Sequence, residues 1–354
     1  MPNQRGLSLV ELMISITLGL LLMAGVVRMF VSSNTVFSSQ QSLSRVQETG
    51  RLAMEFIGRD LRIASSAGCI NTAAVLVGGD RRVEDPVGPS LTGLHSNFTQ
   101  GLVGYTVSVH PTTHVVSGLP SGVSLGSGFT LADNSDVLVI RGANDRGMAI
   151  LSVNNETKVF GYTNQSLVSG CVEGFCQNGI AVISNCRNGR IFQISDVPNV
   201  QASKVTLSHS DSWDIATPSK DLYENGNILP FHTIVYFVAT SDTPVGNTTP
   251  SLWQQIDGGT PVEILQGVER VGFQYMAKPT RSQQVPVYVN ASAVADWDSI
   301  SSVQAEIVVR GDNQFELQEK QTYVFRGGTV EPAATDRYSR KVFRASFSLR
   351  SRNP

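Results

Sequence analysis

The N-terminal sequence RGLSLVELMISITLGLLLMAGVV, residues 5–27, combines a long apolar run with one acidic residue, Glu11. No charged residue occurs from Leu12 to Val27, and the apolar stretch reaches Val31 if the side chain of Arg28 extends its guanidinium to water. A carboxylate in such a segment is costly unless it is paired, so its presence indicates a function. The run therefore predicts one membrane-inserted helix in which Glu11 requires a cationic partner.

The residues around this run do not fit an ordinary secretory signal peptide. Such a peptide has a basic start, a short apolar core and then a small-residue cleavage site. Here Arg5 and the small Gly6 both precede the apolar run, and no Ala-x-Ala-like site follows it. Cleavage after Gly6 would remove residues 1–6 and leave Glu11 as the fifth mature residue. In a bundle of such helices, Glu11 could pair with the terminal amine of a neighbouring subunit, which reduces the cost of both buried charges.

This pattern resembles the class III signal of type IV pilins and pseudopilins. The resemblance implies that a prepilin peptidase cuts after Gly6 and methylates the new N-terminal residue, Leu7. It also implies that Glu11 is the glutamate used in filament assembly. Most members of the family have Phe where this chain has Leu7; leucine is an apolar, accepted variant.

The helix is predicted to continue beyond the membrane, because no proline occurs between Pro2 and Pro86. Arg51, Glu55 and Arg59 are spaced by four residues on one side of this continuation. Apolar and small residues recur on the other side at steps of three and four: Leu43, Val46, Gly50, Ala53, Ile57, Leu61 and Ala64. We therefore expect one helix of about 90 Å, with a transmembrane part at 7–31 and an amphipathic part at 32–66.

The end of this helix narrows the resemblance. The stretch GRLAMEFIGRDLRIASSAGC, residues 50–69, resembles the helix end of PilW-type minor pilins. The matching residues are Met54, Glu55, Arg59, Asp60, Leu61, Arg62, Ala64, Gly68 and Cys69. Weaker resemblances follow in the family's order at residues 135–143, 181–195, 268–277, 297–311 and 340–353.

Residues 67–354 are predicted to form a β-rich head. Short alternating or β-branched runs indicate strands: YTVSV, DVLVIRG, GIAVIS, RIFQIS, KVTLSHS, TIVYFVAT, VPVYV, AEIVV and FRASFSL. Turn-rich segments at 119–128, 241–250 and 327–336 are expected to be surface loops. The resemblance implies an α+β, type IV pilin-like fold, in which the long helix packs on a mainly antiparallel sheet. Because the head is large, we expect that sheet to be enlarged or doubled.

All four cysteines lie beyond the apolar segment, on the side expected to be exported. An even count in that compartment favours two disulfides, and the sequence alone allows three connectivities. Cys171 and Cys176 enclose a short loop that closes easily. Cys69 and Cys186 are the two that match the family pattern, so the resemblance implies that they pair. That long closure would stabilise the head by about 4 to 5 kcal/mol in the chain-entropy model.

No catalytic or cofactor motif is found, so we expect neither an enzyme nor a bound cofactor or metal. The sequence has no phosphate-binding loop, no His-Glu-x-x-His and no Gly-x-Ser-x-Gly. His110 and His114 stand beside a proline at a strand end, where their spacing does not favour metal binding. The segment 132–136 lacks most ligand positions of a calcium loop. Residues 208–212 include Ser, His and Asp, but not in the setting of a catalytic triad. The RGD at 310–312 is interpreted as a chance tripeptide. The net charge of −2 does not suggest nucleic-acid binding, and no direct nucleic-acid site is identified.

These observations predict a minor pilin, a structural subunit at the initiation or tip complex of a type IV pilus. The resemblance implies an inner-membrane precursor with its head in the periplasm, and then a place in the pilus on the cell surface. The implied partners are the prepilin peptidase, other minor pilins, the major pilin and a tip adhesin. Twitching, adhesion and DNA uptake stay open. Two alternatives remain: a J-type pseudopilin of type II secretion, and a membrane-anchored periplasmic binding protein or enzyme.

Overall fold

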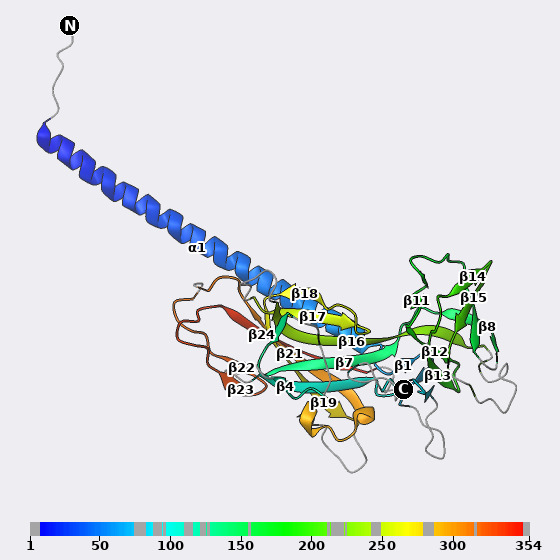
Figure 1. Cartoon of the computed structure of the whole chain (residues 1–354). Helices are drawn as coiled ribbons and strands as arrows, with labels where there is room; N and C mark the ends of the chain where they lie inside the picture. Colours follow the sequence, from blue (N-terminus) through cyan, green and yellow to red (C-terminus); the bar gives the residue numbers. More distant parts are fainter. Residues whose placement is uncertain are drawn as a thin grey trace, which may run out of the picture.

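The computed structural model consists of a long N-terminal helix and a β-rich head (Figure 1). It describes residues 8–73, 83–87, 94, 97–109, 116–120, 125, 128–154, 157–210, 213, 223, 225–241, 249–278, 287–314 and 317–349. The helix projects from the head as a bare rod, and its second half lies along the head (Figure 1). The predicted α+β, pilin-like architecture is confirmed.

Helix α1 spans Leu9–Leu61, which corresponds to about 80 Å. It ends at Leu61 rather than at the predicted Ser66, because Ser65 adopts a left-handed φ of 63° and its N–H donates to the carbonyl of Arg141 at 2.8 Å. The chain then forms the short pair β1, Ser66–Ala67, and β2, Ile70–Asn71. Tertiary hydrogen bonding thus replaces the last predicted turn.

The larger sheet has 14 strands and is organised around β16, the longest strand, at Asn227–Ser241. The first part of β16 pairs with β12 and β8, and the later part pairs with β7, β17 and β6, all antiparallel. The path β14-β15-β9-β8-β16-β12-β13-β3 gives the order of the sheet, and β4, β5, β6, β7, β17 and β18 branch from it. The bounds of these strands are β3 Val83–Glu84, β4 Leu102–Val109, β5 Val116–Ser117, β6 Phe129–Leu131, β7 Ser135–Ala143, β8 Met148–Asn154, β9 Lys158–Tyr162, β12 Ile180–Ser184, β13 Gly189–Gln193, β14 Asn199–Gln201, β15 Lys204–Ser208, β17 Ser251–Ile256 and β18 Val262–Gln266.

The smaller sheet has the order β20-β19-β21-β24 and is antiparallel throughout. Its strands are β19 Val268–Ala277, β20 Tyr288–Asn290, β21 Ile300–Arg310 and β24 Arg340–Ser348. Short elements complete the head: the hairpins β10 Cys171–Val172 with β11 Phe175–Cys176 and β22 Tyr323–Phe325 with β23 Gly328–Val330, and the 3-10 turns η3 Ala291–Ala293 and η4 Trp297–Ser299. The presence of two main sheets agrees with the expected doubling of the sheet. The segment 327–336, predicted to be a loop, contains the short strand β23.

The main core lies where the second half of α1 meets the inner faces of both sheets. Val46, Ala53, Ile57 and Leu61 of the helix are buried there, as the apolar periodicity predicts. Leu43, predicted to share this face, is 50% exposed. The contact of the helix with the head therefore begins near Arg45, which pairs with Asp312.

A second core belongs to a lobe at the end of the head farthest from the N-terminus (Figure 1). This lobe, built by the described residues between 148 and 228, is hereafter called the distal lobe. The structure joins Cys171 to Cys176 across its β10–β11 hairpin, with the Cα atoms 4.4 Å apart. It also joins Cys69 to Cys186, with a Cα separation of 5.2 Å. The second disulfide ties the turn after the helix to the β12–β13 turn of the lobe.

Two glycines allow the helix to lie close to β24. A Cβ atom added at Gly50 would overlap the ring of Phe343, and one at Gly58 would overlap the ring of Phe347. Both rings come from β24, and glycine is unfavourable in a helix interior unless a close contact requires it. The sequence placed Gly50 on the inner face, but the need for glycine appears only in the structure.

Replacement of Gly50 by valine is expected to destabilise the detergent-solubilised full-length protein by about 1 to 3 kcal/mol, because the new side chain displaces Phe343. Gly25→Val is the matched control, since nothing lies within 4 Å of a Cβ atom at Gly25. Urea unfolding followed by far-UV circular dichroism measures both variants. Equal stability of the two would contradict the close helix–strand contact.

Candidate functional site: the exposed rod and its seat on the head

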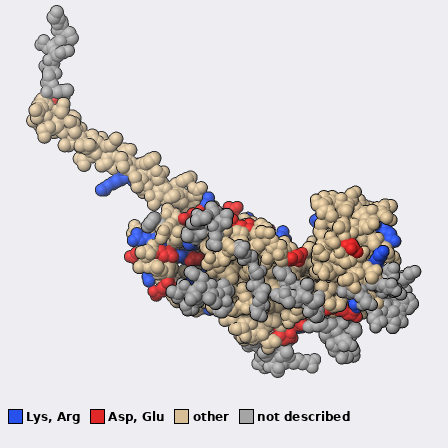
Figure 2. Space-filling model, viewed as in Figure 1, with Lys and Arg blue, Asp and Glu red and all other residues tan. Residues whose placement is uncertain are grey.

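The exposed first half of α1 is the most apolar surface of the described chain. Most of the large apolar side chains that are exposed lie on it, from Leu9 to Leu43. Between Glu11 and Arg45, Arg28 is the only charged residue in the sequence. Figure 2 shows this rod almost free of charge, in contrast to the head. By length and composition the helix can cross a membrane, and an exposed apolar surface of this extent requires a lipid or protein partner.

The three N-terminal positions singled out by the sequence fall at or beyond the start of α1. Glu11 lies in its first turn and is exposed, where a carboxylate interacts favourably with the helix dipole. Gly6 and Leu7 lie outside the described residues. The structure thus places the carboxylate at the free end of the rod, away from the head (Figure 1).

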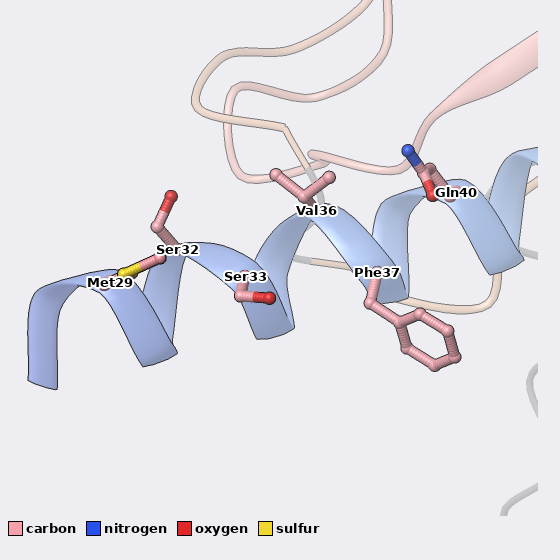
Figure 3. Close-up of a pocket in the computed structure, with 6 residues that line it drawn as sticks. All are labelled: Met29, Ser32, Ser33, Val36, Phe37 and Gln40. Carbon is pink, nitrogen blue, oxygen red and sulfur yellow. The ribbon is translucent and has the colours of Figure 1, made fainter. Parts of the chain in front are cut away.

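A shallow hollow of about 430 Å³ lies on the rod between its apolar end and the head (Figure 3). The residues that line it are Met29, Ser32, Ser33, Val36, Phe37 and Gln40. Small residues bordered by large ones form the kind of surface into which the side chains of a second helix pack. The shape of this helix face therefore suits helix–helix association.

The last turn of α1 is fixed to the large sheet through Asp60, which is 6% exposed. The hydroxyl of Tyr236 on β16 donates to Asp60 Oδ2 at 2.6 Å, and the amide of Gln254 on β17 donates to the same oxygen at 2.8 Å. Burial and the negative charge of Asp60 raise the pKa of Tyr236 well above its ordinary value, so the hydroxyl remains a donor. A buried carboxylate is stable here because neighbouring donors replace water.

Arg59 provides the nearest cation to this carboxylate, with its Nε 3.3 Å from Asp60 Oδ1. The sequence identified Arg59 and Asp60 only as matches to the family's helix end. Glu55, which is spaced to pair with Arg51 and Arg59, forms no ion pair with the described part of the chain. We call the contacts of Asp60, Gly50 and Gly58 with the head the helix seat.

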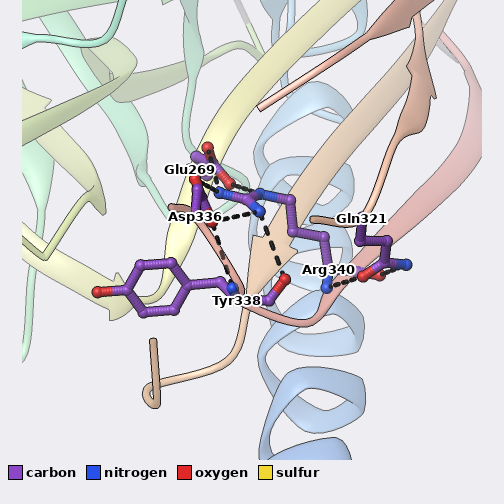
Figure 4. Close-up of polar contacts among 5 residues, drawn as sticks. All are labelled: Glu269, Gln321, Asp336, Tyr338 and Arg340. Carbon is purple, nitrogen blue, oxygen red and sulfur yellow. Dashed lines mark hydrogen bonds and ion pairs between the residues drawn. The ribbon is translucent and has the colours of Figure 1, made fainter. Parts of the chain in front are cut away.

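Strand β24, which packs against the two glycines of α1, begins at Arg340. The side chain of Arg340 is 1% exposed and anchors the strand (Figure 4). Its guanidinium donates to Glu269 at 2.6 Å and to Asp336 at 2.6 Å, and its backbone N–H donates to the side-chain oxygen of Gln321 at 2.7 Å. Burial by itself would lower the pKa of Arg340, but the bonds to the two carboxylates raise it overall. Burial would likewise raise the pKa of Asp336, yet the bonds from Arg340 and from the N–H of Tyr338 lower it. Both groups are therefore charged. This pairing was not predicted from the sequence.

Residues of the segments 132–136, 208–212 and 310–312, which were not expected to form a site, contact other parts of the head. Asp136 of the segment 132–136 is buried, pairs with Arg326 and accepts from the N–H of Phe273 at 2.7 Å. Burial raises the pKa of Asp136 despite that pairing.

In the RGD tripeptide, Arg310 lies over the ring of Tyr338 at 4.4 Å and Asp312 pairs with Arg45. His209 is buried and stacks on Trp213 at 4.2 Å.

Other positions are not described: His110, His114 and residues 211–212 lie outside the described residues. Among those that are described, no three His, Cys, Asp or Glu side chains are grouped so that they could hold a metal ion.

Comparison with known families gives two matches at opposite ends of the chain. A family model described as type IV pilus-assembly protein W, PilW, matches residues 235–351. A model described as the prokaryotic N-terminal methylation motif matches residues 1–27. The resemblance to both is thereby confirmed, and the two matches support a type IV pilus-related minor pilin anchored in a membrane by its apolar helix. No match was found among curated proteins or among solved structures.

Asp60→Asn is expected to lower the free energy of unfolding by about 1 to 3 kcal/mol, because it removes the charge that binds the buried hydroxyl of Tyr236 and the partly buried amide of Gln254. Glu55→Gln removes a charge of the same sign from an exposed position in the same helix and should change stability by less than about 0.5 kcal/mol. Urea unfolding of both detergent-solubilised proteins makes the comparison. An Asp60→Asn protein as stable as Glu55→Gln would mean that the seat does not depend on this carboxylate.

Proposed function

We propose that this chain, which the PilW model matches over residues 235–351 and the methylation motif matches over residues 1–27, is a minor pilin that enters a type IV pilus through α1. The observation that carries the proposal is the bare apolar rod, with Glu11 at its free end and a large head fixed to its other end. The rod lies in the inner membrane before assembly, with the head in the periplasm. It moves into the helical core of the pilus when the subunit is incorporated.

The structural role fits the distribution of polar groups. The buried charged groups described above bind partners within the head: Asp60 in the helix seat, Arg340 at the start of β24, and Asp136 beside Arg326. The apolar rod remains available for association with other subunits. The PilW match favours the pilus over the pseudopilus of type II secretion, which shares the N-terminal features. Within the pilus, the enlarged head supports a position in the initiation or tip complex, beside other minor pilins, the major pilin and a tip adhesin.

Maturation follows from the same N-terminal sequence. The prepilin peptidase removes residues 1–6 by cleavage after Gly6, and Leu7 becomes the methylated N-terminus. Removal of the leader leaves a terminal amine one helical turn from Glu11, which is the geometry needed for pairing between neighbouring subunits.

The mass of the intact protein extracted from membranes tests this maturation. We expect the loss of MPNQRG and the gain of one methyl group. In a strain without prepilin peptidase, the unprocessed mass should appear instead. A mature N-terminus beyond residue 25 would contradict cleavage at Gly6 and favour an ordinary signal peptide.

Glu11 is expected to serve assembly and not membrane insertion. Glu11→Ala and Glu11→Gln should give stable, processed, membrane-bound protein, since removal of a carboxylate makes insertion easier. Both should be poorly incorporated into pili, because the amine of the neighbour loses its counter-charge at a cost of about 3 kcal/mol or more. Glu48→Gln, which removes an exposed carboxylate farther along the same helix, is the control and should be incorporated normally.

The measurement is the amount of this subunit in sheared pili relative to the amount in membranes, for each strain. If both Glu11 variants reach pili at the level of the Glu48→Gln control, the assembly role of this carboxylate is wrong.

A further inference from the structure

The distal lobe presents one sheet face to solvent, formed by β8, β9, β15 and β14 side by side. On this face Tyr162 of β9 is opposite Lys204 of β15, and Phe160 is opposite Thr206. Lys158 is the next outward residue on β9. Residues two apart on a strand point the same way, so the three side chains of β9 form a row with steps of about 7 Å. We call this set of residues on β9 and β15 the aromatic–lysine face.

The opposite side of these strands is the core of the lobe, which fixes the direction of each side chain. Val159, Val205 and Leu207 are fully buried there. Lys158, Tyr162 and Lys204 are exposed, with Tyr162 at 45%, and Phe160 is half-buried. An exposed aromatic ring beside a second ring and two amines is not needed for packing, because the core is complete beneath it.

The charge on this face is of one sign. None of the four strands contains Asp or Glu, and neither lysine pairs with a carboxylate of the described residues. The ammonium of Lys204 lies 3.8 Å from the ring centre of Phe160. The hydroxyl of Tyr162 donates to Asn164 at 2.8 Å, which holds the ring in a defined orientation. In Figure 2, basic side chains lie at the outer margin of this lobe.

We propose that the aromatic–lysine face binds single-stranded nucleic acid. Aromatic rings on a sheet surface stack on unpaired bases, and neighbouring cations contact the phosphates. The exposed ring of Tyr162 offers a face to a base. Lys158 on the same strand, and Lys204, whose ammonium lies over the ring of Phe160, can contact the phosphates on either side. A neutral glycan has no anionic group that the amines of Lys158 and Lys204 could bind. An acidic polymer without bases would make no stacking contact with the exposed ring of Tyr162.

The location of this face makes it accessible in an assembled subunit. It lies at the end of the head opposite the rod (Figure 1) and outside both segments matched by the family models. The binding is a property of the isolated subunit, so it stands or fails independently of the proposed role in pilus assembly.

Fluorescence anisotropy with detergent-solubilised full-length protein tests the proposal, using a labelled eight-residue oligothymidylate. An abasic oligonucleotide of the same length and charge, and a polyuronate, are the comparison probes. We expect binding of oligothymidylate with a slope of about −1.4 in log K against log salt, since two lysines contact phosphates. Binding of the abasic strand should be at least tenfold weaker. Equal binding of both oligonucleotides, or preferential binding of the polyuronate, would overturn the proposal.

Variants separate the rings from the charges. Tyr162→Ala should weaken oligothymidylate binding by about 5- to 150-fold, whereas Tyr162→Phe keeps the ring and should bind nearly as the unaltered protein does. Lys158→Gln and Lys204→Gln should each reduce the salt slope by about 0.7. The control is Lys320→Gln, a lysine that pairs with Glu331 outside the lobe. Unchanged binding by Tyr162→Ala, in a protein with unchanged melting temperature, would rule out the site.

Discussion

The attachment of α1 to the head is the interaction on which the rest of this structure depends. The rod cannot hold its position by its own first half, whose apolar side chains are exposed from Leu9 to Phe37. Its second half must therefore fix both the angle and the rotation of the helix. Glycines at two positions bring the backbone close to β24, and Asp60 binds side chains from β16 and β17. Since these contacts come from both sheets, the helix also holds the sheets together.

Strand β16 extends this arrangement to the far end of the molecule. Its later residues pair with the strands beside the helix seat, and its first residues pair with β8 and β12 of the distal lobe. The disulfide between Cys69 and Cys186 adds a covalent connection from the end of the helix region to the same lobe. A continuous strand and a cross-link together set the direction of the lobe relative to the rod. The family match begins within β16, so the distal lobe lies outside both matched segments.

Charge is treated differently in the two parts of the protein. Where charged groups of the head are buried, as with Arg340 and its two carboxylates, several hydrogen bonds replace the lost water. Removing one partner of such a cluster is costly, so these residues limit how the head can vary. On the rod, Glu11 and Arg28 have no described partner within the chain, and a membrane or another subunit must supply one. The head therefore pairs its buried charges within the chain, whereas the rod carries charges that need a partner outside it.

The sequence determined the features that depend on local pattern. Apolar length and the position of Glu11 predicted the membrane helix, the spacing from Val46 to Leu61 predicted its buried face, and alternation predicted strands such as β7, β12 and β16. These signals are local because period and composition decide which face of an element is buried. Strands β8, β9 and β17 were not predicted, although they are no shorter than the predicted strand β12.

Only the tertiary structure decided which distant residues meet. Asp60 and Tyr236 are 176 positions apart, and nothing in either neighbourhood specifies the other. The end of α1 depends on the carbonyl of Arg141, and the need for Gly50 depends on the ring of Phe343. Tyr162 and Lys204 likewise become one surface only when β9 pairs with β15. The physical reason is that a periodic sequence fixes the direction of a side chain, whereas its partner is fixed by the packing of the whole chain.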